Sequence, residues 1–222
     1  MNGSVATTMT TTFATTLAVL GRAILAAGFL LLASTSPQPA RAEASAPDPA
    51  AATAFVSSLV QRAMSVAGNL AISSDKREST LRELVGEAFD LGYIGRYVLG
   101  ARWQTLGAAE REAYDRAFGE FIMKLYVGRL ARLSGYELQI GDAEILTNAN
   151  IQDVLVASTA TQLDGYSLRL DWRVRSADGR LRIIDIMVDG VSLAKTQRDE
   201  VGSVLQAGDI GLLIAKLRDK ST

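Results

Sequence analysis

The hydrophobic period of the chain changes at Gly135, and this change limits the fold more than any other feature of the sequence. Before Gly135, apolar residues recur at helical spacing; after it, they alternate with polar residues as in half-buried strands. The alternation is clearest over residues 166–174, where every second residue is Tyr, Leu, Trp or Val. Helices followed by strands predict an α+β fold, with helices packed on one face of a curved, mainly antiparallel four-stranded sheet.

The helical part is divided by recognisable end signals. We expect a first helix that ends at Gly68 and a second that begins with a capping box at Asp75–Glu78. The longest helix is expected over residues 108–133. Two helices, over residues 193–205 and 210–218, close the chain with Gly208 as the break between them.

Four segments have strand character and are joined by short turns. They are residues 136–146, 151–161, 166–174 and 181–188. Asp178-Gly179 is typical of a two-residue hairpin turn, which predicts that the last two strands are antiparallel neighbours.

The first 42 residues have the layout of a cleaved secretory signal peptide. Arg22 precedes an 11-residue apolar run, Ala23–Ala33, and a polar stretch then ends in Ala40-Arg41-Ala42. That run is too short to span a bilayer, which takes roughly 20 residues. We therefore expect an exported, periplasmic protein with a signal peptide at 1–42, a flexible tether at 43–52 and one domain at 53–222.

Two absences in the composition exclude whole classes of chemistry. The sequence has no Cys and no His. This rules out cysteine nucleophiles, Ser-His-Asp triads and His- or Cys-based metal sites, so we expect neither a metal nor a cofactor. Bases and acids are interleaved and nearly balanced, at 23 and 24, which argues against a nucleic-acid partner.

Two residue pairs invite a catalytic interpretation. Ser192 and Lys195 have the Ser-x-x-Lys spacing of acyl-transferring serine enzymes, but the companion motifs of those enzymes are absent. Asp185 and Asp189 lie about 13 Å apart along a strand, too far for an ordinary glycosidase pair. Both pairs have structural explanations: Ser192 as a helix cap, Asp185 as a residue bonded to a neighbour and Asp189 as part of a turn. We expect no enzyme activity.

The aromatic and aliphatic residues gathered on one side have two explanations. They form either a filled core or a hollow one that holds an apolar ligand, and the pattern alone does not separate the two.

Several segments resemble one known family. Ile184–Leu193 is similar to its "D-V-x-V-E-G-V-S-L" motif, and Tyr97–Trp103 is similar to its "V-L-G-x-x-W" stretch. The helix with Phe118, Phe121 and Tyr126, the following Ser134-Gly135-Tyr136 and the Gly211-Leu212-Leu213 tail fit in the same order. Together they resemble the MlaC family, also called the toluene-tolerance auxiliary family, across roughly residues 55–218.

This resemblance implies a periplasmic lipid carrier with an apolar pocket between helices and sheet. Such a carrier shuttles a phospholipid between an outer-membrane lipoprotein complex and the substrate-binding component of an inner-membrane ABC transporter. A monomer suits a carrier that docks at both sites in turn.

From the family pattern and from the predicted apolar faces of the helices and strands, we expect eleven residues to line the pocket. They are Val98, Leu99, Trp103, Phe118, Ile122, Tyr126, Leu170, Trp172, Ile184, Ile186 and Val188. Because headgroups would stay in water at the mouth, we expect loose headgroup selectivity.

One segment departs from the family pattern. Many members have an aromatic residue and a Phe where this chain has Gln197 and Val201. Thr196–Glu200 looks more like a relative associated with hopanoid biosynthesis, so a hopanoid is the alternative cargo. A periplasmic adaptor with a filled core that binds only proteins also stays open.

Overall fold

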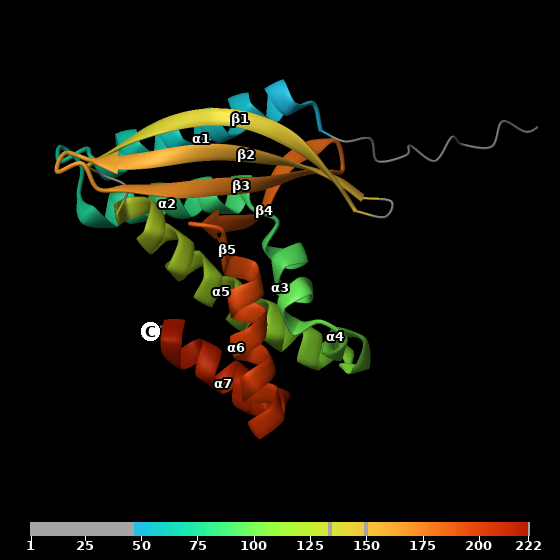
Figure 1. The fold of residues 1–222 in the computed structure, drawn as a ribbon. Coiled ribbons are helices and arrows are strands. Elements are labelled where there is room, and N and C mark those ends of the chain that lie inside the picture. The colour runs from blue at the N-terminus through green and yellow to red at the C-terminus, as the bar shows by residue number, and fades with distance from the viewer. Residues whose placement is uncertain (1–46, 133–134, 149–150, 222) are drawn as a thin grey trace, which may run out of the picture. The chain divides into compact units, whose positions relative to one another are not determined.

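The computed structural model describes residues 47–132, 135–148 and 151–221, and these form an α+β arrangement (Figure 1). The expected signal peptide at 1–42 lies outside the described residues. The helices are α1 (Pro49–Ala67), α2 (Ser74–Ala88), α3 (Leu91–Leu99), α4 (Arg102–Thr105), α5 (Ala108–Arg132), α6 (Leu193–Ala207) and α7 (Ile210–Ser221). The strands are β1 (Tyr136–Asn148), β2 (Ile151–Gln162), β3 (Ser167–Ala177), β4 (Arg180–Val188) and β5 (Val191–Ser192).

The strands form one antiparallel sheet in the order β1-β2-β3-β4-β5. The four expected strands are all present, but the expected number of strands is wrong because β5 adds a fifth. This strand has only two residues and pairs with the end of β4 through a turn at Asp189 and Gly190, where φ is 48° and 80°. Two residues are too few to show an alternating pattern, so the sequence carries no strand signal there.

Turns and caps account for where most elements begin and end. Asp178 and Gly179 have φ of 50° and 72°, which confirms the predicted hairpin turn between β3 and β4. Gly68 is the C-cap of α1, and Gly208 is the C-cap of α6, as expected.

The start of α2 differs from the prediction. Ser73, rather than a capping box at Asp75, accepts the capping hydrogen bond from the Lys76 backbone N–H. The glutamate of the expected box, Glu78, instead pairs with Arg82 one turn further on.

The first helix also begins earlier than expected. Asp48 caps α1 and Pro49 opens it, so residues 49–52 of the expected tether are helical. The Ala52 side chain is fully buried, which anchors this first turn against the rest of the domain.

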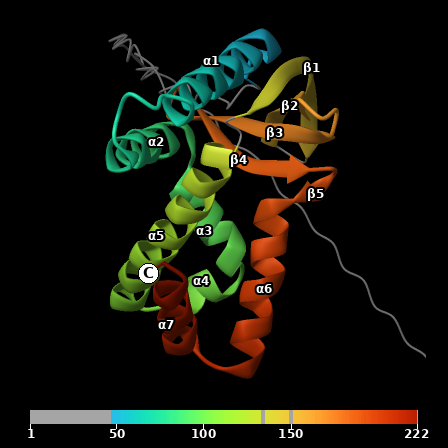
Figure 2. The ribbon, with the colours of Figure 1, turned by 90° about the vertical axis from the view of Figure 1, so that its left-hand side faces the viewer.

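The helices cover one face of the sheet and extend beyond it. Helix α1 crosses β1 and β2, whereas α5 packs against α2 and α7, and α6 continues away from β5 (Figures 1 and 2). Between them lies a hydrophobic core to which the helices and strands β1 to β4 contribute. Among the described residues, no helix has both the length and the apolar character that crossing a membrane requires.

The two faces of the sheet differ in character. The helix-facing side carries apolar residues such as Val156, Trp172 and Ile183, all buried. On the other side, Asp153 is buried and receives hydrogen bonds from Arg173 at 2.8 Å and from Arg175 at 2.6 Å. This alternation leaves the helix-facing side as the place for an apolar site.

Candidate functional site

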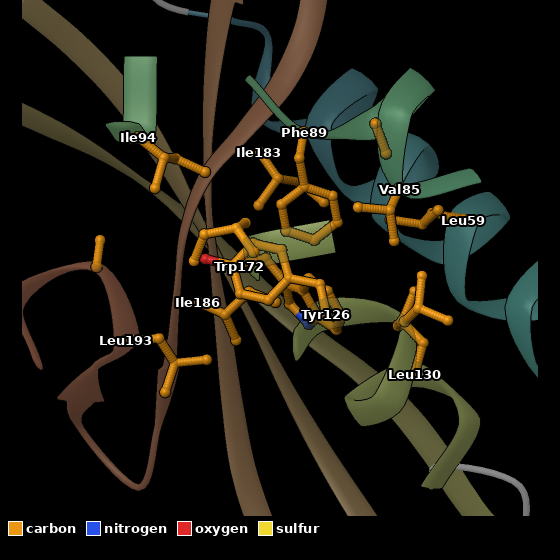
Figure 3. Close-up of a cluster of buried hydrophobic side chains, with 14 of the residues drawn as sticks. Leu59, Val85, Phe89, Ile94, Tyr126, Leu130, Trp172, Ile183, Ile186 and Leu193 are labelled. Atoms are coloured by element: carbon orange, nitrogen blue, oxygen red, sulfur yellow. The ribbon is translucent and has the colours of Figure 1, made fainter. Parts of the chain in front are cut away.

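An apolar pocket of about 210 Å³ lies between the C-terminal end of α5, strands β3 and β4, and the first residue of α6. Figure 3 shows side chains from these four elements converging at this point. The lining residues are Tyr126, Arg129, Leu130, Arg132, Tyr136, Leu168, Leu170, Trp172, Ile186, Val188 and Leu193.

Trp172 is the largest side chain in the pocket wall, and its one polar atom is satisfied. Its Nε1–H donates to the Ser158 hydroxyl at 2.9 Å, and that hydroxyl donates to the Leu170 carbonyl at 2.7 Å. Both Trp172 and Ser158 are buried. The indole is therefore held in one orientation, with no unmet polar group facing the pocket.

Tyr126 reaches the pocket from α5 and carries an unusual hydroxyl. Its ring packs against Phe89 with 4.7 Å between ring centroids. The hydroxyl oxygen is buried and has no hydrogen-bond partner among the described residues. Burial raises the pKa of this hydroxyl well above its ordinary value, Asp185 raises it further, and Arg129 lowers it. The group is therefore a neutral donor over the whole physiological pH range.

Two arginines stand at the exposed side of the pocket. Arg129 and Arg132 are in the last turn of α5 and are both solvent-exposed. Neither has an ion pair among the described residues, and none of the residues that line the pocket is acidic. The site thus combines an apolar interior with a cationic mouth.

The volume indicates what the pocket can hold. A methylene group occupies about as much space as a water molecule, roughly 30 Å³, so the pocket has room for about seven methylenes. This is the end of one acyl chain rather than two whole chains. A larger occupant needs the surrounding helices to move apart.

Two of the hollows that are larger than this pocket are less suited to an apolar ligand. One, of about 450 Å³, lies over β1, β2 and β3 and is lined by Asp142, Glu144 and Arg169 among others. The other, of about 530 Å³, lies between the end of α2 and the β3–β4 turn and includes Asp90, Arg180 and Arg182. Charged walls of both signs favour water in these hollows.

Five of the eleven predicted residues meet at the apolar pocket: Tyr126, Leu170, Trp172, Ile186 and Val188. The sheet residues among them share one face because they are two residues apart along their strands. Six lining residues are additional to the prediction. Of these, Leu130 and Leu168 lie on predicted apolar faces, so the sequence contained a signal for them.

The other six predicted residues lie elsewhere in the core. Val98 and Leu99 border a separate hollow near Arg198 and Gly202. Ile184 is buried at the bulge where the β3–β4 register shifts.

The remaining three are Trp103, Phe118 and Ile122. The Phe118 ring stacks on Tyr114 at 5.4 Å between centroids, and the Trp103 ring meets Tyr114 edge-on. The Tyr114 hydroxyl donates to the Gly95 carbonyl at 2.9 Å, and a Cβ at Gly95 would lie 3.0 Å from Phe118. Such close packing between α3 and α5 leaves Phe118 as a structural residue. Ile122, fully buried, belongs to the same core.

The predicted Ser-x-x-Lys arrangement is not assembled. The Ser192 hydroxyl donates to Asp185 at 2.5 Å and accepts from the Lys195 backbone N–H, which makes it the N-cap of α6. The Lys195 ammonium pairs instead with Asp199 at 2.7 Å, and this hydrogen bond raises the pKa of the lysine. Asp185 also accepts from the Ala194 backbone N–H at 3.0 Å, so it anchors the start of α6 to β4.

Comparison with known proteins gives consistent similarities. The model of the family described as MlaC protein matches residues 54–219. The intermembrane phospholipid transport system binding protein MlaC of Haemophilus influenzae is 28% identical over 137 residues. That match covers 60% of this chain and 63% of the relative, so the chain spans less than two thirds of that protein.

A solved structure has a similar fold. It is the phospholipid-binding protein from Ralstonia solanacearum in complex with a phospholipid, with a TM-score of 0.60 and 20% sequence identity. The match covers 77% of this chain and 96% of the solved one.

Proposed function

Because the chain belongs to the MlaC protein family, we propose that it is a lipid carrier that holds acyl chains of a phospholipid in the pocket between α5, β3, β4 and α6. The observation that carries this proposal is the pocket itself. It combines an aliphatic and aromatic interior with an opening at the protein surface, next to the exposed Arg129 and Arg132. The names of the Haemophilus and Ralstonia relatives, a phospholipid transport protein and a phospholipid-binding protein, support the same class of cargo.

A carrier is needed because lipid does not cross water unaided. Two acyl chains hold about 30 methylenes, and exposing each to water costs ~0.8 kcal/mol, or ~24 kcal/mol in total. The pocket of about 210 Å³ shelters only part of such a chain. We infer that loading widens it by moving α5 and α6 away from the sheet, which needs no covalent chemistry.

The place of action follows from the proposed export signal. A signal peptide over residues 1–42 would deliver the domain to the periplasm. The chain has no Cys to form disulfides there, and a domain with a core of this size does not need them. In that compartment the partners are an outer-membrane lipoprotein complex and the substrate-binding component of an inner-membrane transporter. We propose that the protein meets them as a monomer.

A hopanoid is the alternative cargo, and one region favours it. Gln197 and Val201 are both buried on α6, at the positions where many family members have larger apolar residues. Smaller side chains there leave α6 free to settle at a different distance from α3, which would suit a rigid polycyclic ligand.

Transfer between vesicles tests the carrier function. Donor vesicles contain a fluorescent phospholipid and a quencher lipid, acceptor vesicles contain neither, and the purified protein is added in catalytic amount. The proposal predicts faster fluorescence recovery that scales with protein concentration. A rate equal to that with an unrelated protein of similar charge would reject it, and acceleration for a labelled triterpenoid alone would select the hopanoid alternative.

A further inference from the structure

The mouth of the apolar pocket has a charge pattern that the acyl-chain function does not require. Arg129 and Arg132 both line it, from the last turn of α5. Residues three apart on a helix share a face, so the two guanidinium groups serve one opening. An acyl chain alone would be served equally well by neutral residues.

These two arginines are free to bind a ligand. Other arginines of the domain are engaged: Arg116 pairs with Glu112 and Arg82 with Glu78, each on the same helix. Arg129 and Arg132, by contrast, have no ion pair or hydrogen-bonding carboxylate among the described residues, and no acid lines the pocket with them. Their position at the C-terminal end of α5 stabilises them as cations, because that end carries partial negative charge.

The guanidinium group is suited to one class of anion in particular. It presents its N–H donors in a planar fork that matches the oxygens of a phosphate, and charge-assisted bonds of this kind are the stronger ones. In a phospholipid the phosphate stands next to the glycerol esters, directly above the chains. Once loading has widened the pocket enough to take a whole chain, a chain seated against Trp172 and Ile186 would place its phosphate at the mouth, beside the two arginines.

We propose that Arg129 and Arg132 bind the phosphate of the lipid whose acyl chain occupies the pocket, so that the protein selects phospholipids over lipids of equal chain length that lack a phosphate. This inference rests on the proposed carrier function and deepens it. It modifies the expectation of loose headgroup selectivity: the phosphate is recognised, whereas the alcohol beyond it remains in water and is not.

The test compares two ligands with the same chains. Dioleoylphosphatidylglycerol and dioleoylglycerol differ in the phosphate and its glycerol, and each is titrated in competition with a fluorescent fatty-acyl probe. The Arg129→Gln/Arg132→Gln variant is compared with Arg116→Gln/Lys124→Gln, which removes the same charge from exposed positions of α5 outside the pocket.

The proposal predicts that wild type binds the phospholipid about tenfold or more tightly than the diacylglycerol, since exposed charge-assisted contacts are modest individually. The pocket variant should lose this preference and keep its affinity for diacylglycerol, and the control variant should retain both. Raising the salt concentration should weaken only the phospholipid complex of wild type.

Three results would contradict the account in different ways. Equal phospholipid binding by the two variants, or equal loss of both lipids in the pocket variant, overturns the role of the arginines and leaves the carrier function standing. Failure of wild type to bind either lipid overturns the carrier function itself. Because both arginines are exposed, circular dichroism should show that every variant folds as wild type does.

Discussion

Val188→Phe fills the pocket from a position at the edge of the core. Val188 lies at the end of β4, lines the pocket and is only partly buried. Phe has about four more side-chain carbon atoms than Val, which take the space of about four of the roughly seven methylenes that the pocket admits. At ~0.8 kcal/mol per methylene the loss is ~3 kcal/mol, or about two orders of magnitude in affinity.

The assay is displacement of a fluorescent fatty-acyl probe by phospholipid, with Val191→Phe as the matched control. Val191 is three residues away, is 59% exposed and does not line the pocket. The control should bind as wild type does, and both variants should unfold within ~1 kcal/mol of wild type because the pocket has room for the new ring. Equal affinities for the two variants would refute the assignment of the pocket as the acyl-chain site.

Three further predictions concern the groups that surround the pocket and hold the sheet. Tyr126→Phe removes a buried hydroxyl with no partner, so the free energy of unfolding should stay equal or rise by about 1 kcal/mol in urea denaturation; a clear fall would mean that the hydroxyl has a partner. Burial raises the pKa of Tyr114 and Tyr126, so both keep their protons when folded while the unfolded chain loses them above about pH 10. These tyrosines should therefore leave the free energy of unfolding unchanged below about pH 9 and lower it by ~1.4 kcal/mol per tyrosine for each pH unit above 10. Tyr126→Phe should halve that decrease, and an equal dependence on pH in wild type and variant would contradict the prediction. Asp153→Asn leaves two arginines without their buried carboxylate and should destabilise by about 2–3 kcal/mol, against less than about 0.5 for Glu112→Gln in an exposed pair; similar values would contradict this.

Val188 is a better position than Trp172 for blocking the pocket, because the tryptophan also holds the core together. Trp172 is 1% exposed and its indole is bonded to Ser158. A charged residue in its place would unfold the domain, and a loss of bound lipid would then follow from unfolding. Partly buried wall residues separate the two effects.

The positions of β1 to β4 and of most helices, and the pairing of β3 with β4, could be predicted from the sequence because their signals are local, whereas the short helices α3 and α4 were not predicted. The alternation over residues 166–174 places Leu170 and Trp172 on the same side, and β3 has them there. The Asp178-Gly179 turn fixes the pairing of β3 and β4 because few residues other than Asn, Asp and Gly accept positive φ. The longest helix, α5, begins at Ala108 as predicted and continues to Arg132, and the predicted last residue, 133, lies outside the described residues.

The pocket could be predicted only in part, because periodicity gives the face of an element and not the position along it. Phe118, Ile122 and Tyr126 share one face of α5, yet only Tyr126 lies where α5 meets the pocket. Arg129 and Arg132 were not predicted for the opposite reason. When the helix is divided into an apolar and a charged face, the two arginines fall on the charged face and are assigned to solvent. In the structure, the last turn of α5 lies beside the pocket, so these charged residues line the edge of an apolar site.

The family predicted from the motifs is confirmed, whereas the cargo depends on finer features than the motifs specify. Residues 54–219 match the family model, in agreement with the motifs around Tyr97–Trp103 and Ile184–Leu193. The cargo depends on the volume and polarity of one pocket. These are determined by how a few side chains are arranged in space, which sequence motifs do not specify.

Native mass spectrometry of the mildly purified protein shows whether the protein carries a lipid. Extraction with organic solvent and lipid analysis then identify any bound molecule. We expect one phospholipid per chain, lost in Val188→Phe and retained in Val191→Phe. Protein free of lipid in several independent mild preparations, with the mass of the polypeptide alone, would contradict it and point to a filled core and a protein-binding role.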